Sequence, residues 1–459
     1  MFKKIQHIHF VGIGGVGMSG IAEVLINLGY RVSGSDLKQT TVTERLKSMG
    51  GTIYQGHRRD NIKEADVVVI SSAVEPDNPE VSEAKLKKIP VIPRAEMLAE
   101  LMRLKYSVTV SGTHGKTTTT SMIGLVLARG GLDPTVVIGG KLANFGSNAK
   151  LGKGEYLVAE ADESDGSFLK LTPTIAVVTN IDTDHLDYYG NINKVRKAFL
   201  EFVNKIPFYG AVIVCGDDLQ VQKIIPDIKR RYITYGIEKP ADLKAVNIIH
   251  SILGAEFNLI YFGEDLGRVK LNVPGVHNIY NALAAIAAAM ELELKIEDIK
   301  RAFLEFRGVD RRIQVKGEAR GITVVDDYGH HPTEIKATLS AVKDSWGKRT
   351  IVVFQPHRYT RTKILAKDFG QAFEQADAVI VTEIYAAGEK PIKGVNAGLI
   401  VKNIKASRQG INLKFCPTRQ GVIDALMKTV RPNDLVITLG AGDIWKTGEE
   451  FLEKLKGVN

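Results

Sequence analysis

The sequence contains little cysteine and tryptophan and no long hydrophobic run. Its 459 residues include only two cysteines and two tryptophans. Cys215 and Cys416 stand in no CxxC or metal-ligand spacing, so we expect two buried thiols in a reducing cytosol rather than a disulfide framework. No apolar stretch reaches the roughly 18 residues that span a bilayer. We therefore expect a cytoplasmic protein without membrane insertion.

The sequence also lacks repeats, low-complexity tracts and dense basic clusters. It has 61 lysines and arginines against 52 aspartates and glutamates, a formal net charge of +9. The densest basic runs, at 85–88 and 229–231, contain no aromatic residue. Grooves for nucleic acids combine basic and aromatic side chains, so solvated faces are the favoured interpretation and no nucleic-acid partner is expected. A mild positive field would still suit small anionic substrates.

Strand-like and helix-like segments alternate along nearly the whole chain. This alternation is typical of α/β proteins with largely parallel sheets, and the length predicts about three domains. We predict a Rossmann-like N-terminal domain at 1–98, a central domain with a P-loop ATPase-like, mostly parallel sheet at 99–308, and a Rossmann-like C-terminal domain at 309–459. The stretch 246–273 differs, because its alternation and glycine turns predict an antiparallel hairpin.

The most informative segment is SGTHGKTTTT at 111–120, which follows a β-rich run and opens a helix-prone run. In such a strand–loop–helix unit, backbone N–H groups cradle a polyphosphate. Lys116 can reach between the β- and γ-phosphates, and Thr117 can offer its hydroxyl to Mg²⁺. The general Walker pattern has glycine where this chain has Val110, and a chance helix start is the alternative that both flanks oppose. The predicted ATP contacts are Gly112, Thr113, His114, Gly115, Lys116, Thr117 and Thr118.

A second glycine loop, GIGGVG at 12–17, follows the first strand-like run, and the next such run ends at Asp36. This pattern is typical of dinucleotide-binding units. It is weak evidence on its own, because any diphosphate suits a glycine loop at a helix start. Three interpretations stay open from the residues: a nicotinamide dehydrogenase site, a nucleotide-sugar site, and a tight turn without a ligand.

Acidic side chains crowd the segment EADESD at 160–165. Glu160 and Asp162 can share one face of a strand, and a divalent cation relieves the repulsion between close carboxylates. A solvated acidic turn is the alternative. His185 stands among further acidic residues, which favours a metal ligand or an oriented base over an isolated surface histidine. Histidine suits Mn²⁺ better than Mg²⁺, which prefers oxygen ligands.

Further polar clusters lie at predicted helix starts and strand ends. Asn278 and Asn281 are one helical turn apart, and such side chains can cap a helix or read an adenine edge. His357, Arg358 and Arg361 follow another strand-like run. Arginines three residues apart can converge on a carboxylate or form a solvated helix face. The residues alone leave both choices open.

Taken together, these segments resemble the Mur ligase family over nearly the whole chain. The short GTHGKT loop without the upstream glycine is itself the family's form. The segments GIGGVGMSG (12–20) and DYGHHPTE (327–334) are similar to those of the alanine-adding members. The resemblance also rests on AEADESDGSFL (159–169), TNIDTDHLDYY (179–189), PGVHNIYNALAAIAAA (274–289), QPHRYTRT (355–362) and LGAGDI (439–444).

The resemblance implies an ATP-dependent ligase of peptidoglycan precursor synthesis, with Mg²⁺, or Mn²⁺ as the alternative. It would join L-alanine to the lactyl carboxylate of UDP-N-acetylmuramate through an acyl phosphate. The N-terminal domain would hold the UDP-sugar, the central domain ATP, and the C-terminal domain the amino acid and part of the nucleotide, so no nicotinamide is needed. A family member that attaches a tripeptide to the same UDP-sugar is the alternative. The implied partners are these small molecules alone, bound by a monomer or a homodimer.

The resemblance also assigns roles to single residues by their match to the family's motifs. Lys116, His185, His330 and Arg358 would be catalytic, with His330 or a metal-polarised group as the base. Thr117, Glu160 and His185 would bind metal. Further nucleotide contacts would be Asn180, Asn278, Asn281, Arg312, Asp327 and Tyr328; the UDP-sugar would contact Gly14, Gly15, Gly17, Met18, Ser19, Asp36 and Ser71; alanine and the reacting carboxylate would contact His357, Arg358 and Arg361.

Overall fold

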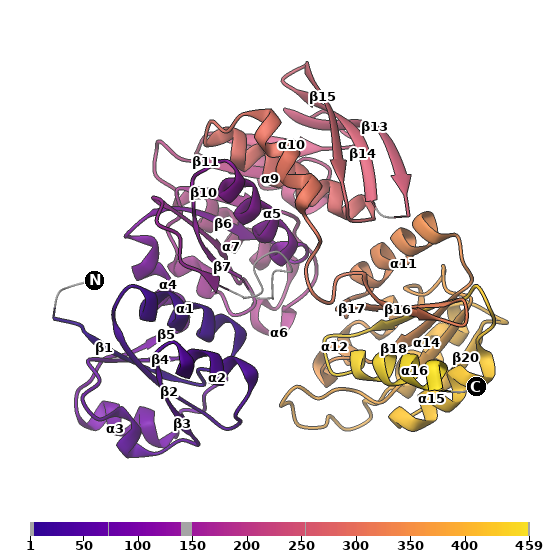
Figure 1. The fold of residues 1–459 in the computed structure, drawn as a ribbon, viewed down its shortest axis with the longest axis horizontal. Coiled ribbons are helices and arrows are strands. Elements are labelled where there is room, and N and C mark those ends of the chain that lie inside the picture. The colour runs from indigo at the N-terminus through magenta and orange to yellow at the C-terminus, as the bar shows by residue number, and fades with distance from the viewer. Residues whose placement is uncertain (1–3, 72, 139–148, 253, 458–459) are drawn as a thin grey trace. The chain divides into compact units, whose positions relative to one another are not determined.

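The computed structural model describes residues 4–71, 73–138, 149–252 and 254–457. Strands and helices alternate along the chain, and the strands form three sheets (Figure 1). The chain divides into two compact units. The first unit comprises 1–247, 257–269 and 280–307, and the second comprises 248–256, 270–279 and 308–459. The predicted α/β class with largely parallel sheets is confirmed, whereas the predicted domain boundaries stay a prediction.

The N-terminal sheet has the strand order β3-β2-β1-β4-β5, and all neighbouring strands are parallel. Because helices cover both faces of such a sheet, its central strands β1 and β4 are almost fully buried and consist mostly of apolar residues. The loops after β1, β2 and β4 leave the same edge, where ligands bind in open α/β sheets. The elements are β1 (His7–Val11), α1 (Val16–Asn27), β2 (Arg31–Asp36), α2 (Thr41–Ser48), β3 (Thr52–Gln55), η1 (Arg59–Ile62), β4 (Val67–Ile70), α3 (Pro79–Leu86), β5 (Val91–Pro93) and α4 (Arg94–Met102).

In the central sheet β6 lies between β9 and β10, in the order β15-β14-β13-β12-β11-β10-β6-β9-β7-β8. Because β6 is parallel to both neighbours, the phosphate loop, the acidic segment after β9 and the segment after β10 meet at one edge. The elements are β6 (Tyr106–Ser111), α5 (Lys116–Arg129), β7 (Thr135–Val137), β8 (Ala149–Lys150), β9 (Tyr156–Glu160), η2 (Ser167–Lys170), β10 (Ile175–Val178), α6 (Leu186–Tyr189), α7 (Ile192–Asn204), β11 (Ala211–Cys215), α8 (Leu219–Gln222), η3 (Ile225–Asp227), β12 (Tyr232–Gly236), β13 (Leu243–Ser251), β14 (Gly254–Tyr261), β15 (Glu264–Leu271), α9 (Val276–Glu291) and α10 (Ile296–Glu305).

The predicted hairpin region differs from the rest of this sheet. β14 and β15 are neighbours joined by Phe262 and Gly263 alone, whose φ angles are +45° and +88°. Two such left-handed residues form the tight turn of an antiparallel hairpin, since a parallel pair needs a much longer connection. The antiparallel pairing expected within 246–273 is therefore present.

The C-terminal sheet has the order β16-β17-β21-β18-β19-β20 and is parallel except for the β16–β17 pair. Phe354, Phe369 and Phe373 fill the core beside it. The elements are β16 (Gln314–Ala319), β17 (Ile322–Asp327), α11 (Pro332–Trp346), β18 (Thr350–Phe354), α12 (Tyr359–Ile364), α13 (Ala366–Gly370), β19 (Ala378–Val381), α14 (Gly398–Ser407), β20 (Asn412–Phe415), α15 (Arg419–Thr429), β21 (Leu435–Leu439) and α16 (Trp445–Gly457).

Two expectations drawn from what the sequence lacks can be compared with the fold. Cys215 is a buried free thiol as predicted, but Cys416 is only half-buried, because it follows the edge strand β20. Across the described ranges, no helix is both long and apolar enough to cross a membrane.

Candidate active site

The phosphate loop connects β6 to α5 through Gly112–Gly115. Gly112 and Gly115 have φ angles of +132° and +81°, in the left-handed region that favours glycine. Side chains also exclude any larger residue, because a Cβ atom on Gly112 would collide with Thr179 and one on Gly115 would lie 2.5 Å from Asn281 Oδ1. The loop therefore requires glycine for its conformation and for the close approach of its neighbours.

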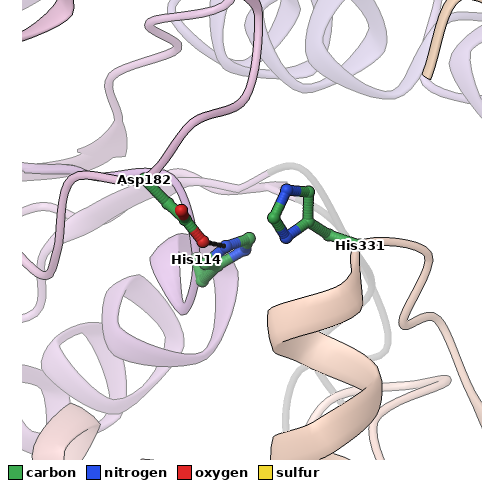
Figure 2. A group of neighbouring side chains, drawn as sticks. All are labelled: His114, Asp182 and His331. Carbon is green, nitrogen blue, oxygen red and sulfur yellow. Dashed lines mark hydrogen bonds and ion pairs between the residues drawn. The ribbon is translucent and has the colours of Figure 1, made fainter. Parts of the chain in front are cut away.

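Hydrogen bonds attach the phosphate loop to the segment that follows β10. The amide group of Asn180 accepts from His114 N–H at 2.8 Å and donates to His114 O at 3.0 Å. Thr113 Oγ1 accepts from Asp182 N–H, and Asp182 Oδ2 lies 3.0 Å from His114 Nε2 (Figure 2). These bonds hold the loop in shape before any ligand binds. Asn180, predicted as a nucleotide contact, thus supports the loop itself.

Lys116 is the first residue of α5, and its ammonium group turns back into the loop. Nζ donates to Gly112 O at 2.6 Å and to Glu163 Oε1 at 2.9 Å. Burial by itself would lower the pKa of Lys116, but the negative charges of Glu163 and Asp162 outweigh it and raise that pKa. A protonated amine thus lies at the helix N-terminus, where phosphate groups are favoured.

Carboxylates of the acidic segment surround this lysine. Burial would raise the pKa of Asp162, but the charges of Lys116 and Arg94 lower it to about 2. The Glu163 side chain is 2% exposed, and among the described residues its Oε2 has no hydrogen-bond partner. The carboxylate of Glu160, at the end of β9, lies close enough to Lys116 to raise its pKa. Buried carboxylate oxygens beside a phosphate loop are ligands of the kind that Mg²⁺ prefers.

His185 lies next to the same carboxylates. Its φ of +56° is uncommon for a residue other than glycine, and it is the N-cap residue that precedes α6. Its Nε2 is 4.0 Å from Glu163 Oε1 and 3.7 Å from Asp184 Oδ2. The structure thus brings Lys116, Glu160 and His185 to one place, as predicted. It adds Glu163, which the prediction left out because the sequence does not show which acid of the run faces the lysine.

The glycine loop of the N-terminal sheet is held by β2. Gly12 and Ile13 donate their N–H groups to Ser35 O, and Gly14 donates to Asp36 Oδ2 at 2.9 Å. Asp36, predicted near the nucleoside, thus supports the loop in this structure. Ser71 Oγ borders the loop, 3.7 Å from where a Cβ atom of Gly12 would lie.

Other members of the predicted UDP-sugar set have structural surroundings of their own. Met18 is 2% exposed and packs into the hydrophobic core, and Ser19 is buried beside it. Gly15 precedes the first residue of α1 and provides no side-chain cap. A Cβ atom on Gly17 would collide with the guanidinium of Arg94, so any larger residue here would displace the guanidinium from its present position.

A cavity of about 170 Å³ lies between the two glycine loops. Gly17 and Arg94 line it on one side, and Lys116, Glu160 and Asp162 line it on the other. Arg94 Nη2 is 3.1 Å from Asp162 Oδ2. Arg94 could not be predicted from the sequence, since its partners stand at distant positions in the chain.

In the second unit, Asp327 shapes the loop that follows β17. Its carboxylate accepts N–H groups from Ile313 and Gly329, both at 2.8 Å, and the hydroxyl of Thr338. Burial raises its pKa. Asp327, predicted as a nucleotide contact, is therefore a buried support of the loop that carries Tyr328 and His330.

Tyr328, His330, His357 and Tyr385 form a continuous row of aromatic rings. Tyr328 lies edge-on to His330 at 5.5 Å between ring centroids, His330 is 5.5 Å from His357, and His357 stacks on Tyr385 at 5.7 Å. Arg312 lies over the ring of Tyr328 at 5.2 Å. Four predicted site residues are thus brought together: Arg312, Tyr328, His330 and His357. Tyr385 was not predicted from the sequence.

Glu334 lies beside His330 and beside Arg312. It accepts the backbone N–H groups of His330 and His331 as part of the cap of α11, and Figure 2 shows His331 at the start of that helix. Its carboxylate also lies 3.5 Å from Arg312 Nη1 and 3.4 Å from His330 Nδ1. One acidic side chain thus orients a predicted phosphate contact and a predicted base. Glu334 is not among the predicted site residues.

Arg358 and Arg361 lie at the start of α12. Arg358 has a φ of +68°, a conformation that is costly for a side-chain-bearing residue and is often found at functional sites. Arg361 is 9% exposed, and its Nη1 lies 3.2 Å from His357 Nδ1. Because a guanidinium only donates, Nδ1 of His357 accepts and the proton of the neutral ring is on Nε2.

The residues predicted at the start of α9 have different neighbours. Asn278 Nδ2 donates to Pro274 O at 2.7 Å, a local bond that supports the helix start. The Asn281 side chain lies beside the phosphate loop and accepts from Thr119 Oγ1 at 3.1 Å. Of these two predicted nucleotide contacts, Asn281 is the one that the described residues place beside the phosphate loop.

Three family models and the sequences of relatives match this chain. The Mur ligase family catalytic domain matches residues 7–106, the Mur ligase middle domain 110–289, and the Mur ligase glutamate ligase domain 311–442. A UDP-N-acetylmuramate–L-alanine ligase of Geotalea daltonii is 59% identical over 456 residues, which cover 99% of each chain. The chain belongs to the Mur ligase family.

Solved structures of Mur ligases share this fold. The UDP-N-acetylmuramate–alanine ligase of Thermotoga maritima superposes with a TM-score of 0.83 at 31% identity, covering 98% of this chain and 99% of that one. A murein peptide ligase of Psychrobacter arcticus has a TM-score of 0.73 at 24% identity, over 99% of both chains. The latter supports the fold alone.

Proposed function

We propose that this Mur ligase joins L-alanine to the lactyl carboxylate of UDP-N-acetylmuramate, with ATP converted to ADP and phosphate. The observation that carries the proposal is the buried, protonated Lys116 at the start of α5, with the carboxylates of Glu160 and Glu163 beside it. This arrangement suits a polyphosphate and a divalent cation. The activity named for the Geotalea daltonii relative, 59% identical over nearly the whole chain, supports the choice of substrates.

The reaction needs an activated carboxylate, because a free carboxylate is a poor electrophile. One carboxylate oxygen attacks the γ-phosphorus of ATP, ADP leaves, and an acyl phosphate forms. The amine of alanine then attacks the acyl carbon, and inorganic phosphate leaves with the bridging oxygen. Lys116 would bridge the phosphates and stabilise the charge that develops during transfer. For this it must give up its bonds to Gly112 O and Glu163.

The residues that would hold a divalent cation are Thr117, Glu160 and His185. Glu163 Oε2, which has no hydrogen-bond partner among the described residues, fits the same role. When bound, Mg²⁺ would offset the repulsion between the phosphates and the carboxylate. Mn²⁺ is the alternative on account of the histidine.

The incoming amine must lose a proton before it attacks, and His330 is the proposed base. Its Nδ1 lies 3.1 Å from Tyr328 O. Because a carbonyl only accepts, the proton of the neutral ring is on Nδ1, and Nε2 is the nitrogen that takes up a proton. Glu334 beside Nδ1 would stabilise the charged ring that results. Arg358 and Arg361 would bind carboxylate groups of the substrates.

ADP release, measured with UDP-N-acetylmuramate and one amine substrate at a time, tests this function. We expect release with L-alanine, weaker release with glycine and L-serine, and little with the tripeptide L-alanyl-γ-D-glutamyl-meso-diaminopimelate. Preference for the tripeptide would instead support the peptide-attaching alternative. ADP release that ignores the amine substrate would contradict both ligase functions.

A further inference from the structure

Arg94 lies where the two halves of the proposed reaction must meet. It follows β5, opens α4, and directs its guanidinium into the cavity between the glycine loops. One end of the guanidinium rests against Gly17, where an added Cβ atom would lie 2.0 Å from Nη1. The other end lies 3.1 Å from Asp162 on the wall that also carries Lys116.

Fold stability does not account for this placement. Among the described residues the ion-pair partner of Arg94 is Asp162, and the two side chains are 33% and 42% exposed. A pair so exposed contributes only about 0–1 kcal/mol. The guanidinium also lies beside the first turn of α1, where the positive end of the helix dipole repels a cation. An anion bound in the cavity would give the guanidinium a stronger partner and would offset the repulsion by the helix dipole.

The cavity carries charged side chains of both signs. The cations Arg94 and Lys116 and the carboxylates of Glu160 and Asp162 line it, so an anionic group that replaces Asp162 beside Arg94 would meet a cation already in place. A guanidinium offers paired donors that match the oxygens of a carboxylate or a phosphate. At about 170 Å³, the cavity has room for the anionic part of a substrate but not for a whole nucleotide sugar, for which sites of 300 Å³ or more are usual.

We propose that Arg94 is a substrate-positioning residue that exchanges Asp162 for an anionic group of the UDP-sugar. This inference rests on the proposed function. The group is either the diphosphate, held at the first glycine loop, or the lactyl carboxylate on its way to Lys116. In both cases Arg94 binds the UDP-sugar and makes no contact with ATP, and Asp162 keeps the guanidinium in place while the site is empty.

Calorimetric binding to Arg94→Gln, without any amine substrate, tests the proposal. We expect its dissociation constant for UDP-N-acetylmuramate to rise about tenfold or more, the usual effect of losing a charged hydrogen bond, while ADP binding changes less than twofold. Arg94→Lys should recover part of the loss. Arg103→Gln is the matched control, because Arg103 caps the other end of α4 and pairs with Glu100 on the surface; it should bind like the wild type.

Two further measurements identify the anionic group that Arg94 binds and distinguish substrate binding from a purely structural role. UDP-N-acetylglucosamine carries the diphosphate but no lactyl carboxylate. Weaker binding of this probe to Arg94→Gln would assign the contact to the diphosphate, and unchanged binding would assign it to the carboxylate. Asp162→Asn removes the resting partner, so its affinity for UDP-N-acetylmuramate should stay the same or increase.

The proposal is wrong if folded Arg94→Gln binds UDP-N-acetylmuramate within twofold of the wild type. It is also wrong if Asp162→Asn weakens that binding as much as Arg94→Gln does, since the ion pair would then act only on the fold. An equal loss of UDP-sugar and ADP binding in Arg94→Gln would have the same meaning. Failure of the wild type to bind UDP-N-acetylmuramate would contradict the proposed function instead.

Discussion

Lys116 is the side chain on which the proposed phosphoryl transfer depends most. The sequence was sufficient to predict it, because a glycine loop between a strand and a helix is local in the chain. Glu163 and Arg94 were beyond such reasoning. Their partners stand 47 and 68 positions away, and only the pairing of β6 with β9 and the packing of α4 bring them together.

Lys116→Ala should lower the rate of ADP formation at least about a hundredfold, the usual effect of removing one donor that stabilises the transition state. Binding of UDP-N-acetylmuramate should survive, because the first glycine loop and Arg94 stay in place. The variant leaves Glu163 buried without its cation, which destabilises folded proteins by several kcal/mol. The double variant Lys116→Ala/Glu163→Gln, which removes both charges, is therefore measured beside the single variant. Lys197→Ala on the exposed face of α7 is the control. Loss of both ADP formation and UDP-sugar binding would argue against separate loops.

His277 makes a prediction about pH. Burial and the charge of Arg312 lower its pKa to about 4, below the usual 6.5 of an unfolded histidine. Between these values the unfolded state binds more protons, so stability is complete above about pH 6.5 and falls as the pH is lowered, by up to about 1.4 kcal/mol per pH unit. Melting temperatures between pH 7 and 5 should fall more for the wild type than for His277→Asn. Equal falls would show that His277 does not stay neutral in the fold.

Elements could be predicted where their signals are local. The phosphate loop and the start of α5 were predicted from glycines between a strand-like and a helix-prone run, and the antiparallel hairpin within 246–273 from alternation and glycine turns. What an element does for its neighbours was less accessible. Asn180 and Asp36 were predicted to contact ligands, and here their side chains hold the two glycine loops by hydrogen bonds. A polar residue after a strand gives the same signal in both roles.

Gly112 and Gly131, which lie before and after α5, provide a matched pair of glycine variants. Gly112→Ala should weaken ATP binding and stability together, because Gly112 has a φ of +132° and its new methyl group would meet Thr179 and the backbone of Asn180. Gly131→Ala shares the left-handed backbone, with a φ of +82°, but its methyl group would meet nothing within 4 Å. It should destabilise by about 1 kcal/mol and leave ATP affinity unchanged. Chemical denaturation and calorimetry measure both quantities; equal ATP affinity in the two variants would contradict this account of the loop.

For the whole molecule, the α/β class with three sheets and the family resemblance are confirmed. The fold class could be predicted because strand-like and helix-like segments alternate along the sequence, as they do in α/β proteins. The resemblance depended on several short motifs occurring in the family's order along the chain. The row of rings from Tyr328 to Tyr385 could not be predicted in the same way, because Tyr385 follows β19, and only the pairing of β18 with β19 brings it beside His357.

The central claim for the whole molecule is that the carboxylate of the UDP-sugar is phosphorylated before alanine attacks. The most direct test uses UDP-N-acetylmuramate with both lactyl carboxylate oxygens replaced by ¹⁸O, together with ATP and L-alanine. The bridging oxygen of an acyl phosphate comes from the carboxylate and leaves with phosphorus. We therefore predict one ¹⁸O atom in each inorganic phosphate released and one in the new amide, both measured by mass spectrometry. Unlabelled phosphate would contradict the account.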